Sequence, residues 1–525
     1  MEHFNVTFQP QGISISLHKG ATLLEAAGKA GIILNTVCGG NGTCEKCAVI
    51  ILPEGKRVLA CQYDIDSDIN IKVPPESEFF EQNILSHGIE AGTRFEPDIY
   101  KNYCNIAAEN NIFGIAVDIG TTTVVAKLIN MTDGSCLATK AALNPQSQFG
   151  DDVIARISYA RNEENLAELQ SVIINRINEL ILALCQQASI TAEQIYEMNI
   201  VGNTTMNHIF RKLPLTSLGQ APYHAYCVDA ADLKPEQLGL KINPAANVHT
   251  VENIAGFVGA DTVAAAIAAD IDSAEKMTLL IDIGTNGEIV LGKANQLYAA
   301  SCAAGPALEG ARIYQGSSAL EGAIQAVVIN DDDIDIDVIG AVPARTICGS
   351  GLIDAVAVLL ELGIIEKTGK FTDKTALPKS LPAKIKARLT QKFDQPAFYL
   401  DKDKKVMLTQ KDIRETQLAK AAIRTGIKLL QKKTGIDDSQ IEICLLAGAF
   451  GNYIKKQSAL KTGLLPAIEP EKIHFIGNAA ATGAVMTLLS SRARAQAGKS
   501  ALKIKYIELA REKDFNSIFT DSLLF

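Results

Sequence analysis

The sequence lacks an excess of positive charge and any long apolar run, and both absences narrow what the protein can bind. Among its 525 residues, 50 Lys and Arg stand against 59 Asp and Glu, a formal net charge of -9. A nucleic-acid partner is disfavoured, because phosphate backbones are bound by basic surfaces. No apolar run reaches the roughly 18 residues that a membrane span needs. The longest candidate, Ala355–Ile365, is short and contains Glu361. We therefore expect neither nucleic acid nor a membrane as partner.

Signals for export and for three familiar kinds of site are also missing. The start, Met1–Phe4, has neither the basic nor the apolar region of a signal peptide, so a cytoplasmic location is expected. No phosphate loop of the form G-x-x-x-x-G-K-S/T is present. The seven histidines are dispersed, with no pair at ligand spacing. They support neither a histidine metal site nor a catalytic triad.

Cysteine is concentrated in one short stretch. Four of the 11 cysteines crowd together with the spacing C-x5-C-x2-C-x13-C, and the other seven are scattered singly. Zinc sites usually use two close pairs, whereas three cysteines in one loop and a distant fourth suit a 2Fe-2S cluster. A structural zinc knuckle and buried thiols without metal are the alternatives. The predicted ligands are Cys38, Cys44, Cys47 and Cys61.

The cysteine loop lies in a small α+β unit, residues 1–76. Its pattern predicts a hairpin of Phe4–Phe8 with Ile13–Leu17, a helix over Ala21–Ala30 and a strand over Ala48–Leu52. The loop and this order of elements resemble the plant- and adrenal-type 2Fe-2S ferredoxins and their β-grasp fold. Residues 77–110 are polar and are interpreted as a linker, with one helix expected near Phe79–Leu85.

One motif occurs twice in the rest of the chain. Val117-Asp118-Ile119-Gly120-Thr121 recurs as Ile281-Asp282-Ile283-Gly284-Thr285, and an apolar run enters and leaves each copy. Each copy predicts a strand, a tight turn and a second strand, and the pair predicts two lobes of one fold, residues 111–275 and 276–525. Helical and strand patterns alternate around them, which indicates α/β architecture. The expected helices cover 152–160, 164–188, 259–269, 351–362 and 415–433, and further strands cover 199–201 and 442–446.

The two repeated turns are suited to binding a phosphate chain, because backbone N–H groups converge at glycine-rich turns. Asp118 and Asp282 are expected at strand ends that face the same space. Such a pair suits a Mg-nucleotide, since Mg²⁺ takes few carboxylates and fills its shell with water and phosphate. A coincidental pair of structural hairpins is the alternative. The residues predicted to contact the nucleotide are Gly120, Thr121, Thr122, Thr123, Gly284, Thr285, Asn286, Gly287 and Glu288.

Two other loops are less specific. Glu309 lies in the constrained loop Gly305–Gly310, where it is predicted either to touch Mg²⁺ or position water, or to belong to a structural turn. The segment Gly202–Thr205 follows a predicted strand. It either lines the cleft or forms a plain turn.

The paired hairpins resemble the phosphate-1 and phosphate-2 motifs of the superfamily that contains acetate and sugar kinases, the large heat-shock chaperones and actin. The resemblance implies a third, glycine-rich element that holds adenosine. Leu445–Asn452 resembles it, with Gly448 and Gly451 placed against base and ribose. The implied fold class is α/β multidomain: an N-terminal β-grasp 2Fe-2S ferredoxin domain followed by a two-lobed actin-like (ribonuclease-H-like) ATPase fold.

The order of these modules is similar to that of the reductive activators of corrinoid proteins, over essentially the whole chain. Asn144-Pro145-Gln146 and Ile347–Leu352 extend the likeness. The resemblance implies an ATP-hydrolysing enzyme that passes one electron from a 2Fe-2S cluster to Co(II) and regenerates Co(I) for methyl transfer. It implies ATP and Mg²⁺, a corrinoid protein of a methyltransferase system as partner, an upstream low-potential electron donor and a homodimer. Together with the residue-level interpretation of Glu309, the catalytic candidates in this sequence are Asp118, Asp282 and Glu309.

Two alternatives stay open. The first is an ATP-driven electron donor to a radical-type dehydratase, although such activators usually bridge a 4Fe-4S cluster between two subunits. The second is a chaperone-like ATP switch whose cluster senses redox state. Conversion of a Co(II) corrinoid protein to Co(I) by the reduced protein with ATP discriminates among the three.

Overall fold

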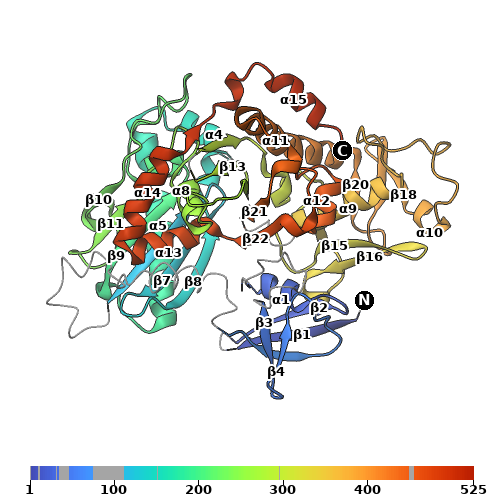
Figure 1. The fold of residues 1–525 in the computed structure, drawn as a ribbon, viewed down its shortest axis with the longest axis horizontal. Helices are drawn as coiled ribbons and strands as arrows, with labels where there is room; N and C mark the ends of the chain where they lie inside the picture. Colours follow the sequence, from blue (N-terminus) through green and yellow to red (C-terminus); the bar gives the residue numbers. More distant parts are fainter. Residues whose placement is uncertain are drawn as a thin grey trace.

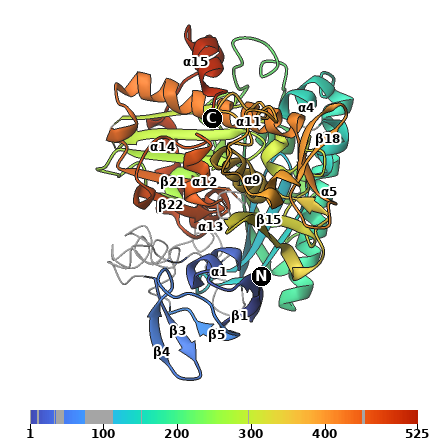
Figure 2. The same cartoon turned by 90° about the vertical axis from the view of Figure 1, so that its right-hand side faces the viewer.

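The structure is a computed structural model, and it describes residues 2–9, 12–30, 32, 34, 47–74, 112–150, 152–294, 296–448 and 454–525. Figure 1 shows a small N-terminal module below two larger lobes, and Figure 2 shows the same arrangement from the side. The predicted linker at 77–110, with its expected helix near Phe79–Leu85, lies outside the described residues.

The N-terminal module is a five-stranded sheet in the order β2-β1-β5-β3-β4. Strands β1 and β5 pair in parallel at its centre. Alternation along β1 buries Val6 and Phe8 against helix α1, because successive side chains of a strand point to opposite faces. The predicted hairpin, helix and strand are confirmed. The elements are β1 (His3–Gln9), β2 (Ile13–His18), α1 (Leu23–Lys29), β3 (Ala48–Leu52), β4 (Lys56–Leu59) and β5 (Ile69–Lys72).

The first lobe is built on a six-stranded sheet in the order β10-β11-β9-β6-β7-β8. Strands β6, β7 and β8 form an antiparallel meander, and β9 and β11 continue the sheet in parallel with β6. The elements are β6 (Phe113–Ile119), β7 (Thr123–Asn130), β8 (Cys136–Leu143), η2 (Pro145–Phe149), α4 (Val153–Tyr159), α5 (Glu163–Ala188), η3 (Ala192–Gln194), β9 (Ile195–Gly202), α6 (Thr204–Phe210), β10 (Ala231–Leu233), α7 (Pro235–Leu238), β11 (Asn247–Thr250) and α8 (Ala260–Ala268).

The second lobe repeats this plan in a sheet of order β22-β21-β12-β13-β14-β23. Its meander is β12, β13 and β14, and β21 and β22 continue it in parallel with β12. The elements of the sheet and the helices after it are β12 (Thr278–Ile283), β13 (Gly287–Lys293), β14 (Gln296–Cys302), α11 (Gln410–Thr434), η6 (Asp438–Gln440), β21 (Ile443–Ala447), α12 (Lys456–Lys461), η8 (Pro470–Lys472), β22 (Ile473–Gly477), α13 (Ala479–Leu489), α14 (Ser491–Lys503), β23 (Lys505–Tyr506), η9 (Leu509–Arg511) and α15 (Phe515–Ser522). The prediction of two lobes with one fold is confirmed.

Two small sheets inserted in the second lobe were not predicted. They have the orders β16-β15-β17 and β18-β19-β20. The inserted elements are η4 (Pro306–Glu309), β15 (Ala323–Asn330), β16 (Asp333–Val338), η5 (Ile339–Ala341), β17 (Thr346–Ile347), α9 (Gly349–Glu361), α10 (Ala383–Lys386), β18 (Leu389–Lys392), β19 (Gln395–Tyr399) and β20 (Met407–Thr409). The five expected helices form as α4, α5, α8, α9 and α11, and the two expected strands form within β9 and β21.

Helices α8 and α13 join the lobes, because they share one hydrophobic core with both large sheets. This core contains Ala116 and Val201 from the first sheet and Leu280 and Val290 from the second. The two helices cross closely at Gly483, where an added Cβ would lie 2.1 Å from the carbonyl oxygen of Ala264. The lobes therefore meet through a packed layer of two helices, seen at the centre left of Figure 1.

The N-terminal module contacts the second lobe at strand β16. Nε2 of His3 lies 2.9 Å from Oδ1 of Asp337. The other oxygen of this buried carboxylate accepts a hydrogen bond from the Gln325 side chain at 2.8 Å. Figures 1 and 2 both show the start of β1 beside the β15–β16 hairpin. This hydrogen-bond contact connects the first residues of the chain to the inserted sheet.

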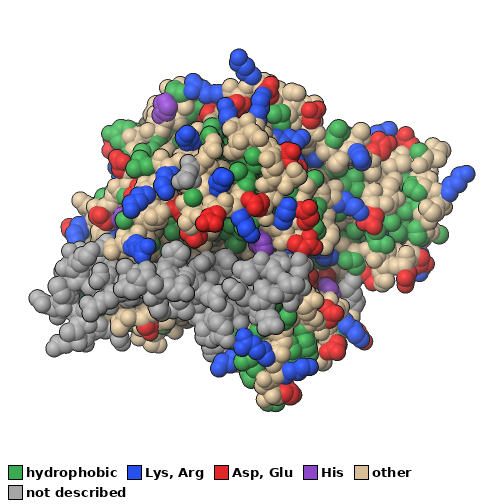
Figure 3. All heavy atoms as spheres, viewed as in Figure 1, with side chains coloured by type: hydrophobic (Ala, Val, Ile, Leu, Met, Phe, Trp, Pro, Cys, Tyr) green, Lys and Arg blue, Asp and Glu red, His purple; other side chains and the backbone are tan. Residues whose placement is uncertain are grey.

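The described surface carries both signs of charge. On the face shown in Figure 3, acidic and basic side chains are interspersed. Among the helices of the described residues, none has both the length and the apolar character needed to cross a membrane.

Candidate functional site

The two repeated turns meet across a cavity between the lobes. We call residues 118–123 the first phosphate hairpin and residues 282–288 the second. Oγ1 of Thr122 in the first lies 2.8 Å from Oγ1 of Thr285 in the second. The cavity has a volume of about 480 Å³. Its lining includes Asp118, Gly120, Thr121, Thr122, Thr123, Asn203, Asp261, Asp282, Gly284, Thr285, Asn286, Glu288, Glu309, Gly448 and Asn478.

The first turn is tight because Gly120 donates its N–H to the Thr123 carbonyl at 3.0 Å. An added Cβ at Gly120 would lie 2.6 Å from that same oxygen, so a side chain does not fit. In the second turn, Gly284 donates its N–H to the Asn286 carbonyl at 3.1 Å. Both turns leave the cavity lined by backbone and by small polar side chains, which suits the oxygens of a phosphate chain.

Besides Glu309, four carboxylates line the cavity: Asp118, Asp261, Asp282 and Glu288. Burial raises the pKa of Asp118 to about 7, although a hydrogen bond from Asn478 partly offsets this rise. Burial and the nearby charges of Asp261 and Asp118 raise the pKa of Asp282 to about 7. Mutually repelling carboxylates in a desolvated site are stabilised by a divalent cation, and oxygen ligands are those that Mg²⁺ prefers.

The other two carboxylates show the same effect. Burial raises the pKa of Asp261 to about 6, against opposing hydrogen bonds from Thr262. Burial, with the charges of Asp261 and Asp282, also raises the pKa of Glu288 well above its ordinary value. The pKa values of all four carboxylates are therefore raised, so that each is protonated more readily than an ordinary Asp or Glu side chain.

Glu309 connects the two hairpins. Its Oε2 accepts hydrogen bonds from the hydroxyls of Thr122 and Thr285, both at 3.0 Å. Burial raises the pKa of Glu309, against these two hydrogen bonds. The loop Gly305–Gly310 thus brings the Glu309 carboxylate into the cleft. This position is the one needed for a role at Mg²⁺ or at a water molecule.

Gly448 ends strand β21 beside the second hairpin. Its φ is +90°, and an added Cβ would lie 2.6 Å from Oδ1 of Asp282. Only glycine fits this conformation and this close approach. Gly451, the other predicted adenosine contact, lies outside the described residues.

Gly287 differs from its neighbours in the second hairpin, because it is absent from the residues that line the cavity. An added Cβ there would lie 2.7 Å from Sγ of Cys302 and 3.1 Å from Ile423. This face of Gly287 packs into the lobe. Gly287 therefore does not line the cavity in which the nucleotide is expected, and its contact with the nucleotide stays a prediction.

The predicted cluster site is described at two of its four cysteines. Cys47 and Cys61 are both buried, and their Sγ atoms lie 3.4 Å apart. Two thiol groups at this separation can bind one metal ion together, so the described part fits a thiolate-bound cluster. Cys38 and Cys44 lie outside the described residues. The side chain of Gln62 adds an amide donor 3.7 Å from Sγ of Cys61.

Several lining residues were not assigned to the site from the sequence, among them Asp261, Asn203 and Asn478. Asp261 lies in the first turn of α8, and a carboxylate in the first turn of an alanine-rich helix was the available signal. Asn203 and Asn478 are the N-caps of α6 and α13. The sequence allows two interpretations of the segment Gly202–Thr205, a lining of the cleft or a plain turn. The structure places Asn203 at the cleft.

Comparison with known proteins covers nearly the whole chain. Residues 276–525 match the C-terminal domain of RACo, the ASKHA domain, and residues 113–274 match the RACo middle region. Residues 6–65 match the 2Fe-2S iron-sulfur cluster binding domain. The described Cys61 lies within that last match.

Full-length relatives agree with these matches. The chain is 35% identical to the corrinoid activation enzyme RamQ of Eubacterium limosum, over 97% of this chain and 98% of the relative. It is 25% identical to the [Co(II) methylated amine-specific corrinoid protein] reductase of Methanosarcina barkeri, over 73% of this chain and 71% of that protein. A solved structure of a reductive activator for corrinoid, iron-sulfur protein matches with a TM-score of 0.73 and 29% identity, over 99% of this chain and 98% of that one.

Proposed function

Because this chain belongs to the family of reductive activators of corrinoid proteins, we propose that it uses ATP to return an oxidised corrinoid protein from Co(II) to Co(I). One observation carries the proposal. A single chain joins a 2Fe-2S domain to a cleft formed by two glycine turns and lined by five carboxylates. The first part supplies single electrons and the second suits a Mg-nucleotide.

The cluster domain comprises residues 1–76. Cys47 and Cys61, with Cys38 and Cys44, are the residues that hold the cluster, which supplies one-electron transfer when bound. Burial of the two described cysteines excludes water from their sulfurs. The Gln62 amide offers a hydrogen bond to Cys61 Sγ, a contact of the kind that tunes cluster potentials.

The nucleotide site is shared by residues 111–275 and 276–525. Asp118 and Asp282 are the proposed Mg²⁺-binding carboxylates, with Asp261 and Glu288 close behind them. The turns of the two hairpins would contact the phosphates, and Gly448 is the described residue proposed to contact the adenosine, with Gly451 as the second candidate from the sequence. Glu309, hydrogen-bonded to a threonine of each hairpin, positions the attacking water.

ATP is needed because the electron step is unfavourable by itself. A plant-type cluster has a reduction potential of about -400 mV. Each ~60 mV by which the acceptor's potential is more negative lowers the equilibrium constant of a one-electron transfer tenfold. An acceptor of lower potential is therefore reduced only when binding or hydrolysis changes the acceptor or traps the product. Residues of both lobes line the cavity, so a nucleotide bound there would influence how the lobes close on each other and on a bound partner.

Two further partners follow from the family resemblance. We propose a low-potential electron donor that reduces the cluster, and a homodimer of this chain. Light scattering of the purified protein tests the homodimer, which a monomer mass over the working concentration range would exclude.

The central test measures Co(I) formation. The holoprotein is reduced with titanium(III) citrate and mixed with a purified Co(II) corrinoid protein of a methyltransferase system. We expect the Co(I) absorption spectrum to appear with Mg-ATP and not without it. Equal Co(I) yields with and without nucleotide would contradict the proposal. Asp282→Ala is the matched variant, expected to keep the cluster spectrum and to lose the ATP-dependent yield.

A further inference from the structure

Three asparagines from distant parts of the chain each connect a helix to the first phosphate hairpin. In each, the side-chain oxygen caps a helix and the side-chain amide reaches the hairpin. For Asn144, Oδ1 accepts the N–H of Gln146 at 3.0 Å at the start of η2. Its Nδ2 donates to the Gly120 carbonyl at 2.8 Å. This asparagine therefore holds the backbone of the turn.

Asn203 and Asn478 repeat the arrangement at two other residues of the first phosphate hairpin. Asn203 caps α6 by accepting the N–H of Met206 at 3.0 Å, and its Nδ2 donates to Oγ1 of Thr121 at 3.0 Å. Asn478 caps α13 by accepting from the N–H of Ala481 at 2.8 Å. Its Nδ2 donates to Oδ2 of Asp118 at 3.1 Å. Backbone, hydroxyl and carboxylate of one hairpin are each held from a different helix.

Two of the three asparagines, and an arginine that also binds the hairpin, are buried and hydrogen-bonded, which restricts their movement. Asn144 is fully buried and Asn203 is 6% exposed. A fourth contact comes from the fully buried Arg156, whose Nη2 donates to the Thr121 carbonyl at 2.6 Å. Buried polar side chains with satisfied hydrogen bonds have one geometry, because moving them would leave groups unpaired.

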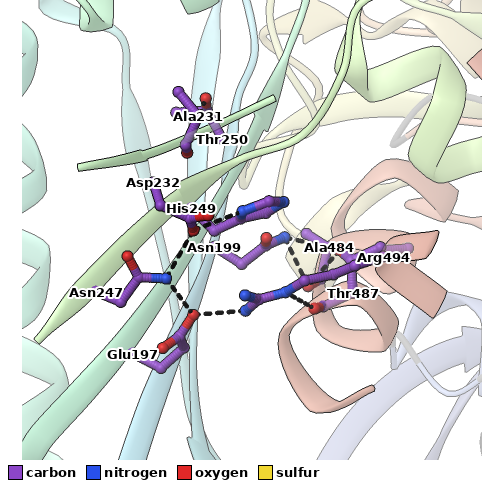
Figure 4. A network of polar contacts seen from close by, with 11 residues as sticks. Glu197, Asn199, Ala231, Asp232, Asn247, His249, Thr250, Ala484, Thr487 and Arg494 are labelled. Carbon is purple, nitrogen blue, oxygen red and sulfur yellow. Dashed lines mark hydrogen bonds and ion pairs between the residues drawn. The ribbon is translucent and has the colours of Figure 1, made fainter. Parts of the chain in front are cut away.

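Helix α13 is also anchored at its far end, as Figure 4 shows. Nδ2 of Asn199, on strand β9, donates to the carbonyl of Ala484 at 3.0 Å and to Oγ1 of Thr487 at 2.8 Å. Arg494 in the next helix forms a buried ion pair with Glu197 at 2.6 Å. The helix that carries Asn478 at its start is thus fixed to the first sheet through its second half, at Ala484 and Thr487.

We propose that Asn144, Asn203 and Asn478 are positioning residues for ATP turnover, which together fix the geometry of the first phosphate hairpin through three separately anchored helices. The inference rests on the proposed nucleotide site and adds how that site is held. A short turn between two strands does not fix its side chains by itself, and reactive geometry must be held to about 0.5 Å. Helices that are packed elsewhere supply that precision.

Asparagine is required for this double role. Its side chain offers an acceptor and two donors on one planar group, so one end caps while the other reaches across. Serine caps a helix about as well as asparagine does. Its hydroxyl lies at the cap, and the side chain is too short for that same group to reach the hairpin as well. A serine substitution therefore removes the positioning contact and leaves the cap.

The test compares Asn203→Ser and Asn478→Ser with Asn162→Ser in the full holoprotein. Asn162 caps α5 through the N–H of Asn165 at 2.8 Å and is exposed, so it is the same substitution at a cap outside the cleft. We expect about a tenfold lower kcat for Mg-ATP hydrolysis in each cleft variant, with KM within about threefold of the parent. Melting temperature should stay within about 2 °C. Asn162→Ser should hydrolyse ATP at the parent rate.

Two results would overturn the inference. One is parent-like kcat in both cleft serine variants. The other is a loss of kcat accompanied by a fall in melting temperature as large as that of Asn203→Ala and Asn478→Ala, which would make the asparagines caps only. Failure of the proposed function is seen separately in the same assay, as absence of Mg-ATP hydrolysis by the parent chain with its corrinoid partner.

Discussion

At the scale of single residues, Gln62 is the side chain expected to change the reduction potential of the cluster. Its amide lies 3.7 Å from Sγ of Cys61. Hydrogen bonds to cluster sulfurs stabilise the more negative, reduced state and so raise the potential. A bond worth roughly 1 kcal/mol corresponds to about 40 mV for one electron. Gln62→Leu should therefore lower the cluster potential by tens of millivolts in a redox titration, with the visible spectrum retained. An unchanged or higher potential would rule out this contact in the holoprotein.

The carboxylates of the cleft predict how stability depends on pH when Mg²⁺ and nucleotide are removed. The folded pKa values of Asp118 and Asp282 are about 7, above the ordinary value near 3.9 for an unfolded chain. The folded state therefore binds the extra protons, and the stability they contribute is present at low pH and lost as pH rises through about 7. The melting temperature of the metal-free chain should fall between pH 5 and pH 8.

Asp282→Asn isolates this effect, because it removes one of the titrating groups and the repulsion with its neighbours. We expect a shallower fall in melting temperature over the same pH range, and Mg-ATP should also reduce the fall in the parent chain. Asp133→Asn, at an exposed turn, is the matched control and should keep the parent slope. Equal slopes in Asp282→Asn and the parent would show that another group titrates.

These residues also mark what a sequence can predict about a site. Asp118 and Asp282 could be paired because the two copies of one motif imply equivalent positions in two equivalent lobes. Asp261 could not, since it reaches the cleft only because α8 packs between the two sheets. Asn203 and Asn478 look like ordinary helix caps in sequence, and their second bond exists only after distant helices assemble. Gly287 was predicted as part of a turn that offers backbone N–H groups, and no sequence pattern indicated that the side where a Cβ would lie packs against Cys302 and Ile423.

At the scale of elements, the polar contacts between β9 and the C-terminal helices predict a large stability effect. The Glu197 carboxylate is 2% exposed and pairs with Arg494. Arg494→Met would leave that charge buried without its guanidinium, which costs about 3–5 kcal/mol of unfolding free energy. Adding Glu197→Gln should recover part of the loss, because no charge then stays buried. Urea unfolding followed by circular dichroism measures both.

An exposed ion pair provides the comparison. Lys384 and Asp332 are each more than half exposed, so Lys384→Met should cost little unfolding free energy, because solvent screens an exposed pair. A similar small loss for Arg494→Met would mean that Glu197 is neutral or hydrated in the folded chain. Burial, which raises the pKa of Glu197 against the opposing charge of Arg494, makes this pair sensitive to its partner.

Long or repeated elements were predictable, and the inserted sheets were missed for identifiable reasons. Helices α5 and α11 run over many turns and keep one apolar face, which is a strong signal. Strand β18 is four residues long and has no fully buried side chain, so it carries almost no pattern. Strand β16 was detectable, because Asp333–Val338 alternates acidic and apolar residues. Its acidic face binds partners from later in the chain: Asp333 pairs with Arg388 and Asp335 with Lys402.

At the scale of the whole molecule, the hydrophobic cores divide the chain into two units rather than three. The N-terminal module has a core of its own, from Val6 to Val73. The two lobes each have an outer core, but they share the central one around α8 and α13. Because that shared layer includes both sheets, opening one lobe would expose apolar surface of the other. The lobes should therefore unfold together, while the cluster domain is joined to them by contacts such as His3 with Asp337.

This division predicts two thermal transitions in the holoprotein, one for the cluster domain and one for the joined lobes. A ligand stabilises only the unit that binds it, by about 2.7 kcal/mol at a hundredfold excess over Kd. Mg-ATP should therefore raise the temperature of the second transition by several degrees and leave the first unchanged. Removal of iron should lower only the first. Differential scanning calorimetry, with the cluster spectrum followed in parallel, assigns each transition. If Mg-ATP moves both transitions equally, the cluster domain and the lobes form one cooperative unit, and the His3–Asp337 contact belongs to a larger interface that transmits nucleotide binding directly to the cluster.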